Sequence, residues 1–223
     1  MPYHSETADV IFRHDYGTQI FTWYHSSLQF GQHYAFSVGM PSPTGSRSIS
    51  GNSGNNDNVV SATTTTIAED ISDKIVDMML HFSRTYKSMP SSSIIHIGRT
   101  SNLVQYEWQK KTSGSLEGYC ETKSVSITNL LLLNSCLDYL LQSIETHSTT
   151  LIILDRMEFL FENNTDEALV SKVLAILKSL QEVKNALIIS ISATEDAHVK
   201  DLSFSINATF SNWKRRNVNN IYI

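Results

Sequence analysis

Cysteine, metal-binding patterns and long apolar runs are all scarce in this sequence. Two cysteines, Cys120 and Cys136, occur in 223 residues, and they form no CxxC pair. We therefore expect reduced thiols, because a disulfide scaffold or a structural zinc site needs more cysteines in closer spacing. The eight histidines are scattered without metal-ligand spacing, and no apolar run approaches the roughly 20 residues that span a bilayer. The sequence predicts no metal, no cofactor and no membrane segment.

Positive charge is also in short supply. The 17 lysines and arginines are outnumbered by 22 acidic residues, so the formal net charge is −5. Any contact with nucleic acid must then come from a local basic patch. The candidate is Lys214-Arg215-Arg216, beside which Trp213 could stack on an exposed base. A solvated turn with a core tryptophan is the alternative. Possible additions to the patch are Arg47, Arg99, Lys110 and Lys111.

What is present is an alternation of strand and helix patterns. Short runs rich in aliphatic residues predict strands at 33–39, 93–98, 149–155 and 185–192, with a weaker one at 122–127. Apolar residues spaced by three and four predict helices at 62–87, 101–111, 128–146 and 166–184. Thr128 is the expected N-cap of the third. This order predicts an α/β fold, a mostly parallel sheet flanked by helices. The ends are less regular: an edge strand or short helix within 8–24, and two short strands within 206–223.

One segment interrupts this order. Residues 41–61 are rich in Ser, Gly, Asn and Pro and contain almost no apolar side chain. Such a tract cannot bury enough surface to offset the entropy of ordering it, so we expect a flexible polar loop. The length fits a single domain over residues 1–223.

Asp155 ends the most apolar strand, Leu151-Ile152-Ile153-Leu154. The carboxyl ends of such strands are where open α/β sheets bind ligands, and in P-loop NTPases an Asp here helps to hold magnesium. A P-loop needs GxxxxGK[ST] between a strand and a helix. After the strand at 33–39, the chain instead has glycines one position too far apart, a serine in place of the lysine, and two prolines that remove N–H donors. The degenerate Walker A positions are Gly39, Gly45, Ser46, Arg47 and Ser48.

Without a phosphate cradle, Asp155 has no magnesium–nucleotide complex to hold. We expect it to cap a local turn or to pair with a nearby basic residue. No GxSxG elbow is present, and His96 within an apolar strand is expected to be a core histidine rather than a base. No catalytic residue is assigned.

The segment 149–192 resembles the second half of a RecA-like recombinase core. The matching features are a Walker B-like strand "LIILD", then "EFLF", the helix "LVSKVLAILKSLQEVKNA" and the strand "LIISIS". The resemblance extends over roughly residues 30–223. It implies a RecA-like P-loop NTPase core with a degenerate nucleotide site and Asp155 in the Walker B position.

In its small size and degenerate Walker A, the chain resembles the recombinase paralogues of the Shu complex. That resemblance implies a non-catalytic nuclear subunit in homologous recombination repair. It would pair with another RecA-like paralogue, bind DNA, contact the recombinase and promote assembly of its filament. The RecA-like accessory subunits of Elongator, which bind tRNA, share these features and imply a structural role, in the cytoplasm. A weak NTPase is the third hypothesis.

Four aromatic residues near the N-terminus are candidates for an interface with a partner, and burial in the chain's own core is the alternative. They are Tyr16, Phe21, Trp23 and Tyr24.

Overall fold

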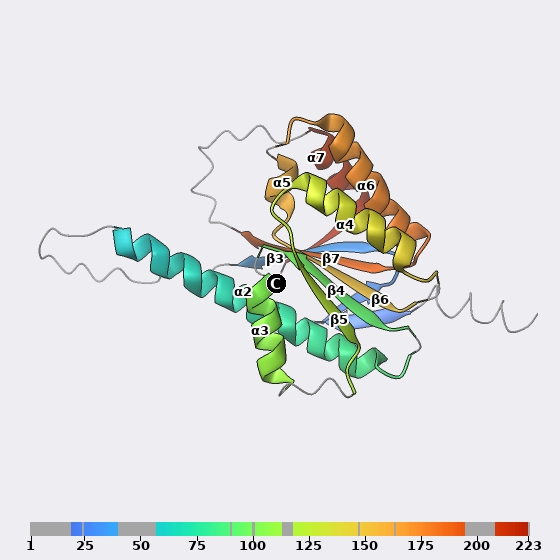
Figure 1. Ribbon diagram of the computed structural model, residues 1–223, viewed down its shortest axis with the longest axis horizontal. Coiled ribbons are helices and arrows are strands. Elements are labelled where there is room, and N and C mark those ends of the chain that lie inside the picture. The colour runs from blue at the N-terminus through green and yellow to red at the C-terminus, as the bar shows by residue number, and fades with distance from the viewer. Residues whose placement is uncertain are drawn as a thin grey trace, which may run out of the picture.

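One six-stranded sheet organises the molecule, with helices on both of its faces (Figure 1). The computed structural model describes residues 19–23, 25–39, 57–89, 91–99, 101–112, 118–146, 148–162, 164–194 and 208–222. The strand order is β5-β4-β6-β7-β3-β8, and every pair is parallel. The bounds are β3 His33–Gly39, β4 Ser93–Gly98, β5 Glu121–Ser126, β6 Thr150–Asp155, β7 Leu187–Thr194 and β8 Val218–Tyr222.

The most apolar strand lies inside the sheet, as its sequence predicts. All six residues of β6 are buried, and β6 pairs with β4 on one side and β7 on the other. A strand covered on both faces can be apolar at every position, which explains the unbroken run Leu151–Leu154. The predicted α/β class and the predominantly parallel sheet are confirmed.

The two faces of the sheet are covered by different sets of elements. One face packs against α2 (Asp57–Tyr86), α3 (Ser101–Lys111) and a hairpin of β1 (Ile20–Trp23) and β2 (Ser26–Gln29). The other packs against α4 (Leu130–Ser143), α5 (Glu158–Glu162), α6 (Glu167–Glu182) and α7 (Ala208–Asn217). Figure 1 shows the two groups on opposite sides of the strands.

Side-chain caps fix where the two long helices of the second face begin. Asp166 accepts a hydrogen bond from Leu169 N over 3.0 Å at the start of α6. Asn129 accepts one from Leu132 N over 2.9 Å at the start of α4. Asn129, not Thr128, is therefore the N-cap of α4. Both residue types cap well, and sequence alone does not separate neighbours of equal propensity.

Two other boundaries differ from the sequence prediction. Helix α2 begins at Asp57, inside the tract 41–61 for which a loop is predicted, and the rest of that tract lies outside the described residues. Near the other end, α7 takes the place of the first of two predicted strands. Phe210 and Trp213 are three residues apart and both pack against the second face, which is helical rather than strand periodicity.

The aromatic residues of β1 belong to the core. Phe21 and Trp23 are 1% and 6% exposed, and Trp23 meets Phe36 edge-on at 4.8 Å between ring centroids. They are therefore core residues rather than interface anchors. Tyr16 and Tyr24 lie outside the described residues.

Candidate functional site

Asp155 lies at the carboxyl edge of the sheet with its side chain fully buried. The next residue, Arg156, reaches back to it. Arg156 Nε donates to Asp155 Oδ1 over 2.8 Å, and Arg156 Nη2 donates to Oδ2 over 3.3 Å. This two-point contact is the strong form of an Arg–carboxylate pair. The prediction that Asp155 pairs with a nearby basic residue is confirmed.

The backbone of Arg156 is what makes the contact between adjacent residues possible. Its φ is +51°, in the left-handed region that side-chain-bearing residues rarely adopt. A hydrogen bond from Arg156 N to Ile191 O, 2.8 Å long, ties this turn to β7. The sheet therefore holds the backbone of the turn from which the Arg156 side chain reaches Asp155.

Gly98 is the neighbour of Asp155 on β4, opposite it in the register. A Cβ atom on Gly98 would lie 2.7 Å from Asp155 Cβ and 2.8 Å from Asp155 Oδ2. Both distances are shorter than real Cβ contacts, so a residue larger than glycine would displace the carboxylate. The strand β4 ends in glycine because the Asp155 side chain occupies the space above it.

A row of polar groups continues from Asp155 across the face covered by α2 and α3. His96 on β4 is fully buried, and its Nε2 lies 3.8 Å from Asp155 Oδ2. Ser124 Oγ on β5 lies 3.5 Å from His96 Nδ1. Among the described residues, His96 Nε2 has no hydrogen-bond partner. His96 is thus a core histidine, as predicted, and these distances are too long for a working nucleophile–base pair.

The strand expected to precede a phosphate loop ends at the same edge of the sheet. Phe36 on β3 and Asp155 on β6 are both paired with Ile191 of β7, so they stand at one level. Gly39 ends β3 beyond that level and pairs with Thr194. β7 separates the two strands. The other predicted Walker A positions, Gly45, Ser46, Arg47 and Ser48, lie outside the described residues.

The predicted basic triplet lies on the last turn of α7. Arg215 and Arg216 are exposed, while Lys214 is half-buried. Trp213 is also half-buried, and its ring meets His33 edge-on at 5.5 Å. Trp213 Nε1 is buried and has no hydrogen-bond partner among the described residues. The tryptophan packs on the sheet, so α7 presents arginines, not an aromatic ring, to solvent.

His33 lies under this helix at the start of β3. Burial, with a smaller contribution from the charge of Lys214, lowers the pKa of His33 from 6.5 to about 3. The neutral ring is 2.7 Å from Ser190 Oγ through its Nε2. His33 therefore serves as an uncharged support for Trp213.

The remaining predicted cations do not join the triplet. Arg99 follows β4 at the carboxyl edge, and its guanidinium lies 4.8 Å from the Phe159 ring centroid. Lys110 is within 3.4 Å of Glu107, and Lys111 contacts Asp73 and Asp77 over 2.6 and 2.7 Å. Burial lowers the pKa of Lys111, but its hydrogen bonds to these two aspartates outweigh burial and raise it. Lys110 and Lys111 lie on α3, on the opposite face from α7, and Arg47 is outside the described residues.

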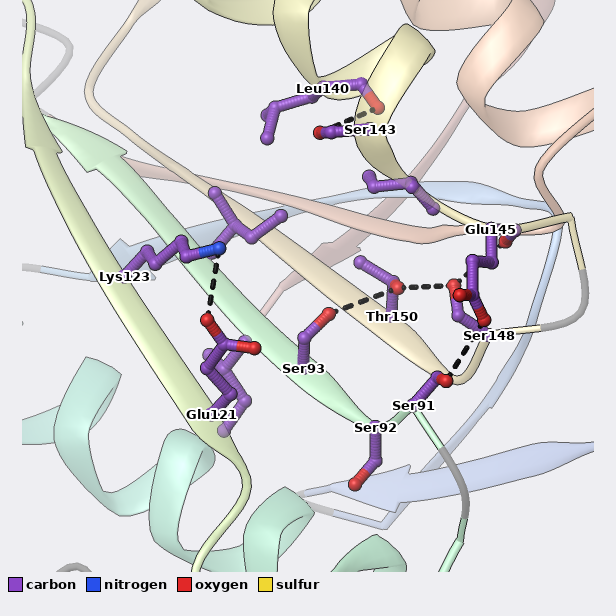
Figure 2. A pocket seen from close by; sticks show the side chains of 13 residues that line it. Ser91, Ser92, Ser93, Glu121, Lys123, Leu140, Ser143, Glu145, Ser148 and Thr150 are labelled. Atoms are coloured by element: carbon purple, nitrogen blue, oxygen red, sulfur yellow. Dashed lines mark hydrogen bonds and ion pairs between the residues drawn. The ribbon is translucent and has the colours of Figure 1, made fainter.

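The amino edge of the sheet carries a polar cavity that sequence reasoning missed. It has a volume of about 230 Å³ and lies among the starts of β4, β5 and β6 and the end of α4. Figure 2 shows a chain of hydroxyls at its wall: Thr150 Oγ1 lies 3.2 Å from Ser93 Oγ and 2.9 Å from Ser148 Oγ. Ser91 donates to Glu145 over 3.0 Å, and Lys123 pairs with Glu121 over 2.9 Å. The sequence feature that could have indicated it is the run Ser91-Ser92-Ser93 before β4.

The described part of the chain has neither a cluster of metal ligands nor a membrane-spanning helix. Among these residues, no group of three or more His, Cys, Asp or Glu side chains could hold a metal ion. No described helix is both long enough and apolar enough to cross a membrane.

Comparison with known proteins places the chain in no family. No family model matches it, and no curated protein matches it. Among solved structures it is similar to PCH-2 of C. elegans, with 12% identity and a TM-score of 0.27. The match covers 75% of this chain and spans 44% of that protein. A likeness this weak supports no argument about function.

Proposed function

We propose that this chain is a non-catalytic subunit with a RecA-like core, related to recombinase paralogues, that binds DNA and promotes recombinase filament assembly. Support for a RecA-like core comes from the resemblance over 149–192 together with the sheet order. The strand of "LIILD" is β6, and the strand of "LIISIS" is β7, its neighbour. β7 in turn pairs with β3, the strand that ends at Gly39.

The Arg156–Asp155 pair is the observation that carries the non-catalytic part of the proposal. A carboxylate that assists a metal–nucleotide complex needs oxygen atoms turned toward that complex. Here both oxygens of Asp155 accept from one guanidinium, and the side chain is fully buried. Ligand binding at Asp155 would first have to break this pair, which is expensive in a buried setting.

Support for DNA binding comes from α7. Arg215 and Arg216 are exposed on consecutive positions of its last turn. Guanidinium groups recognise phosphate through two parallel hydrogen bonds. In a chain with a net charge of −5, such a local pair would supply the attraction that bulk charge does not.

The test is DNA binding measured by fluorescence anisotropy across a salt series, on single-stranded and on double-stranded DNA. We expect Arg215→Gln/Arg216→Gln to weaken binding and to reduce the slope of log K against log salt by about two, one for each lost phosphate contact. The matched control is Arg84→Gln/Lys87→Gln, which removes the same charge from exposed positions near the end of α2. An equal loss in both variants would show that only net charge matters and would contradict the α7 surface.

Hydrolysis and partner assays separate the alternatives. We expect no ATP hydrolysis above background; activity that disappears in Asp155→Asn, with the fold intact by circular dichroism, would instead establish a weak NTPase. Purification from the native cell should recover another RecA-like subunit or the recombinase. Recovery of tRNA-modifying Elongator subunits would overturn the recombination role and support the structural alternative.

A further inference from the structure

The strand β5 forms one edge of the sheet within the described part of the chain. It pairs with β4 along its whole length, from Glu121 opposite Ser93 to Ser126 opposite Gly98. Its outer side has no described strand beside it. An edge of this kind carries a row of N–H and C=O groups that can pair with another strand.

The helices that precede and follow β5 in the chain, α3 and α4, carry exposed apolar side chains and lie on opposite faces of the sheet. On α3, Leu103 and Tyr106 are 41% and 63% exposed. On α4, Leu131, Leu132 and Tyr139 are 63%, 47% and 64% exposed. α3 contacts β5 directly, and Tyr139 of α4 is close enough to contribute to the raised pKa of Lys123, whose main cause is Glu121. Apolar surface gathered around an unpaired edge is typical of an interface.

The charged residues of β5 could pair with those of a second β5 strand. Glu121 and Lys123 are two residues apart, so both side chains point to the same face of the sheet, where they pair over 2.9 Å. If two β5 strands meet antiparallel about a two-fold axis through Thr122, each Glu121 lies opposite Lys123 of the other copy. Opposite charges directly across a strand pair are favourable, and like charges are unfavourable.

We propose that a second copy of this chain docks on β5, joining two six-stranded sheets into one across a two-fold axis near Thr122. Such a contact is isologous: the same surface meets itself. The axis stands perpendicular to the sheet, so each face continues into the same face of the other copy. α4 then meets α4, which covers Leu131, Leu132 and Tyr139. This inference does not depend on the proposed function.

The competing explanation is that Lys123 prevents other strands from pairing with β5. Lysine in an edge strand is a common device against unwanted pairing, because its charge must be desolvated when another strand approaches. The two ideas predict opposite results for the loss of this charge. If Lys123 protects the edge, Lys123→Ala strengthens self-association; if Lys123 pairs with Glu121 across the axis, Lys123→Ala weakens it.

The experiment is sedimentation equilibrium of the full chain over a range of concentrations, with charge-swapped variants. Lys123→Glu and Glu121→Lys each place like charges opposite one another at two symmetric points, so each should weaken dimerisation by about tenfold or more. The double variant Glu121→Lys/Lys123→Glu restores opposite charges at both points and should restore the dimer. Loss of the dimer in both single reversals and its recovery in the double variant is the result that the two-fold pairing predicts.

A second variant tests the apolar part of the contact. Leu131→Ser/Tyr139→Ser should weaken the dimer and leave the far-UV circular dichroism spectrum and thermal midpoint nearly unchanged, since both side chains are already largely exposed in one copy. A chain that stays monomeric at all concentrations overturns the proposal. Stronger association in Lys123→Ala also overturns it, as does a double swap that behaves like the single reversals.

Discussion

The two ends of the sheet bury different kinds of polar side chain, charged at the carboxyl end and neutral at the amino end. At the carboxyl end, Asp155 is fully buried and both of its oxygens accept from Arg156, while Gly98 leaves room for the carboxylate. At the amino end, the hydroxyls of Ser93, Ser148 and Thr150 face an open cavity of about 230 Å³. Polar groups satisfy one another at both ends, but a buried acid–cation pair does so at the carboxyl end and neutral hydroxyls do so at the amino end, where Ser148 and Thr150 are buried as well.

The difference has an energetic consequence. A buried carboxylate that loses its cation leaves an uncompensated charge, whereas a neutral hydroxyl that loses one hydrogen bond leaves only an unsatisfied polar group. Substitutions at the carboxyl end should therefore cost more than substitutions of similar size at the amino end.

The largest effect is expected for Arg156→Gln. The glutamine amide cannot neutralise Asp155, so the buried carboxylate loses its guanidinium, and we expect a loss of about 3 kcal/mol in the free energy of unfolding. The paired change at the amino end is Thr150→Val, which leaves Ser148 its hydrogen bond to Glu145 O and creates no buried charge, so it should cost about 1 kcal/mol. Urea denaturation measures both. Equal losses would show that the two ends do not differ as described.

A smaller loss is expected for Gly98→Ala. The added methyl would stand 2.7 Å from Asp155 Cβ, and overpacking of this kind costs about 2 kcal/mol. The conflict should shrink in the background Asp155→Gly, where that Cβ is absent, so a double-mutant cycle isolates it. Losses that simply add would place the strain elsewhere.

The weakest effect at neutral pH, and one that grows on acidification, comes from His33. Its pKa is about 3 when folded, against 6.5 for an unperturbed histidine, so between these two pH values the unfolded chain binds a proton that the folded chain does not. Stability should therefore fall by about 1.4 kcal/mol for each pH unit below roughly 6.5. His33→Gln should flatten this part of the curve. Parallel curves for wild type and His33→Gln would exclude His33 as the cause.

The sequence predicts the central strands and the apolar faces of α2 and α6 well because burial itself sets their patterns. Four consecutive aliphatic residues before Asp155 suit a strand covered on both faces, and the spacing in α6 places Val173, Leu177 and Leu180 on one buried stripe. These signals are local and strong. The contact of Asp155 with a basic residue is also a local signal, because Arg156 follows it directly in the sequence.

What escaped sequence reasoning depends on contacts between distant segments. The position of Gly98 against Asp155 follows from strand register, and the His96–Ser124 contact joins β4 to β5. Neither contact is indicated by a local pattern in the sequence. The sequence predicts a strand where α7 forms, because two aromatic residues in so short a segment are a weak signal; their spacing of three residues and the stacking of Phe210 on Phe161, at 4.5 Å between ring centroids, fit the helix. The cavity at the amino edge is assembled from strand starts that lie far apart in the sequence.

The order β5-β4-β6-β7-β3-β8 also constrains how the chain can be made. β3 is the first strand of the sheet to leave the ribosome, yet its partners are β7 and β8, with His33 beside Ile188 and Val218. Until those distant residues have been synthesised, β3 has both of its edges uncovered, and joining them requires closing a very long loop. β3 should therefore complete its pairing only late, after β7 and β8 have been synthesised.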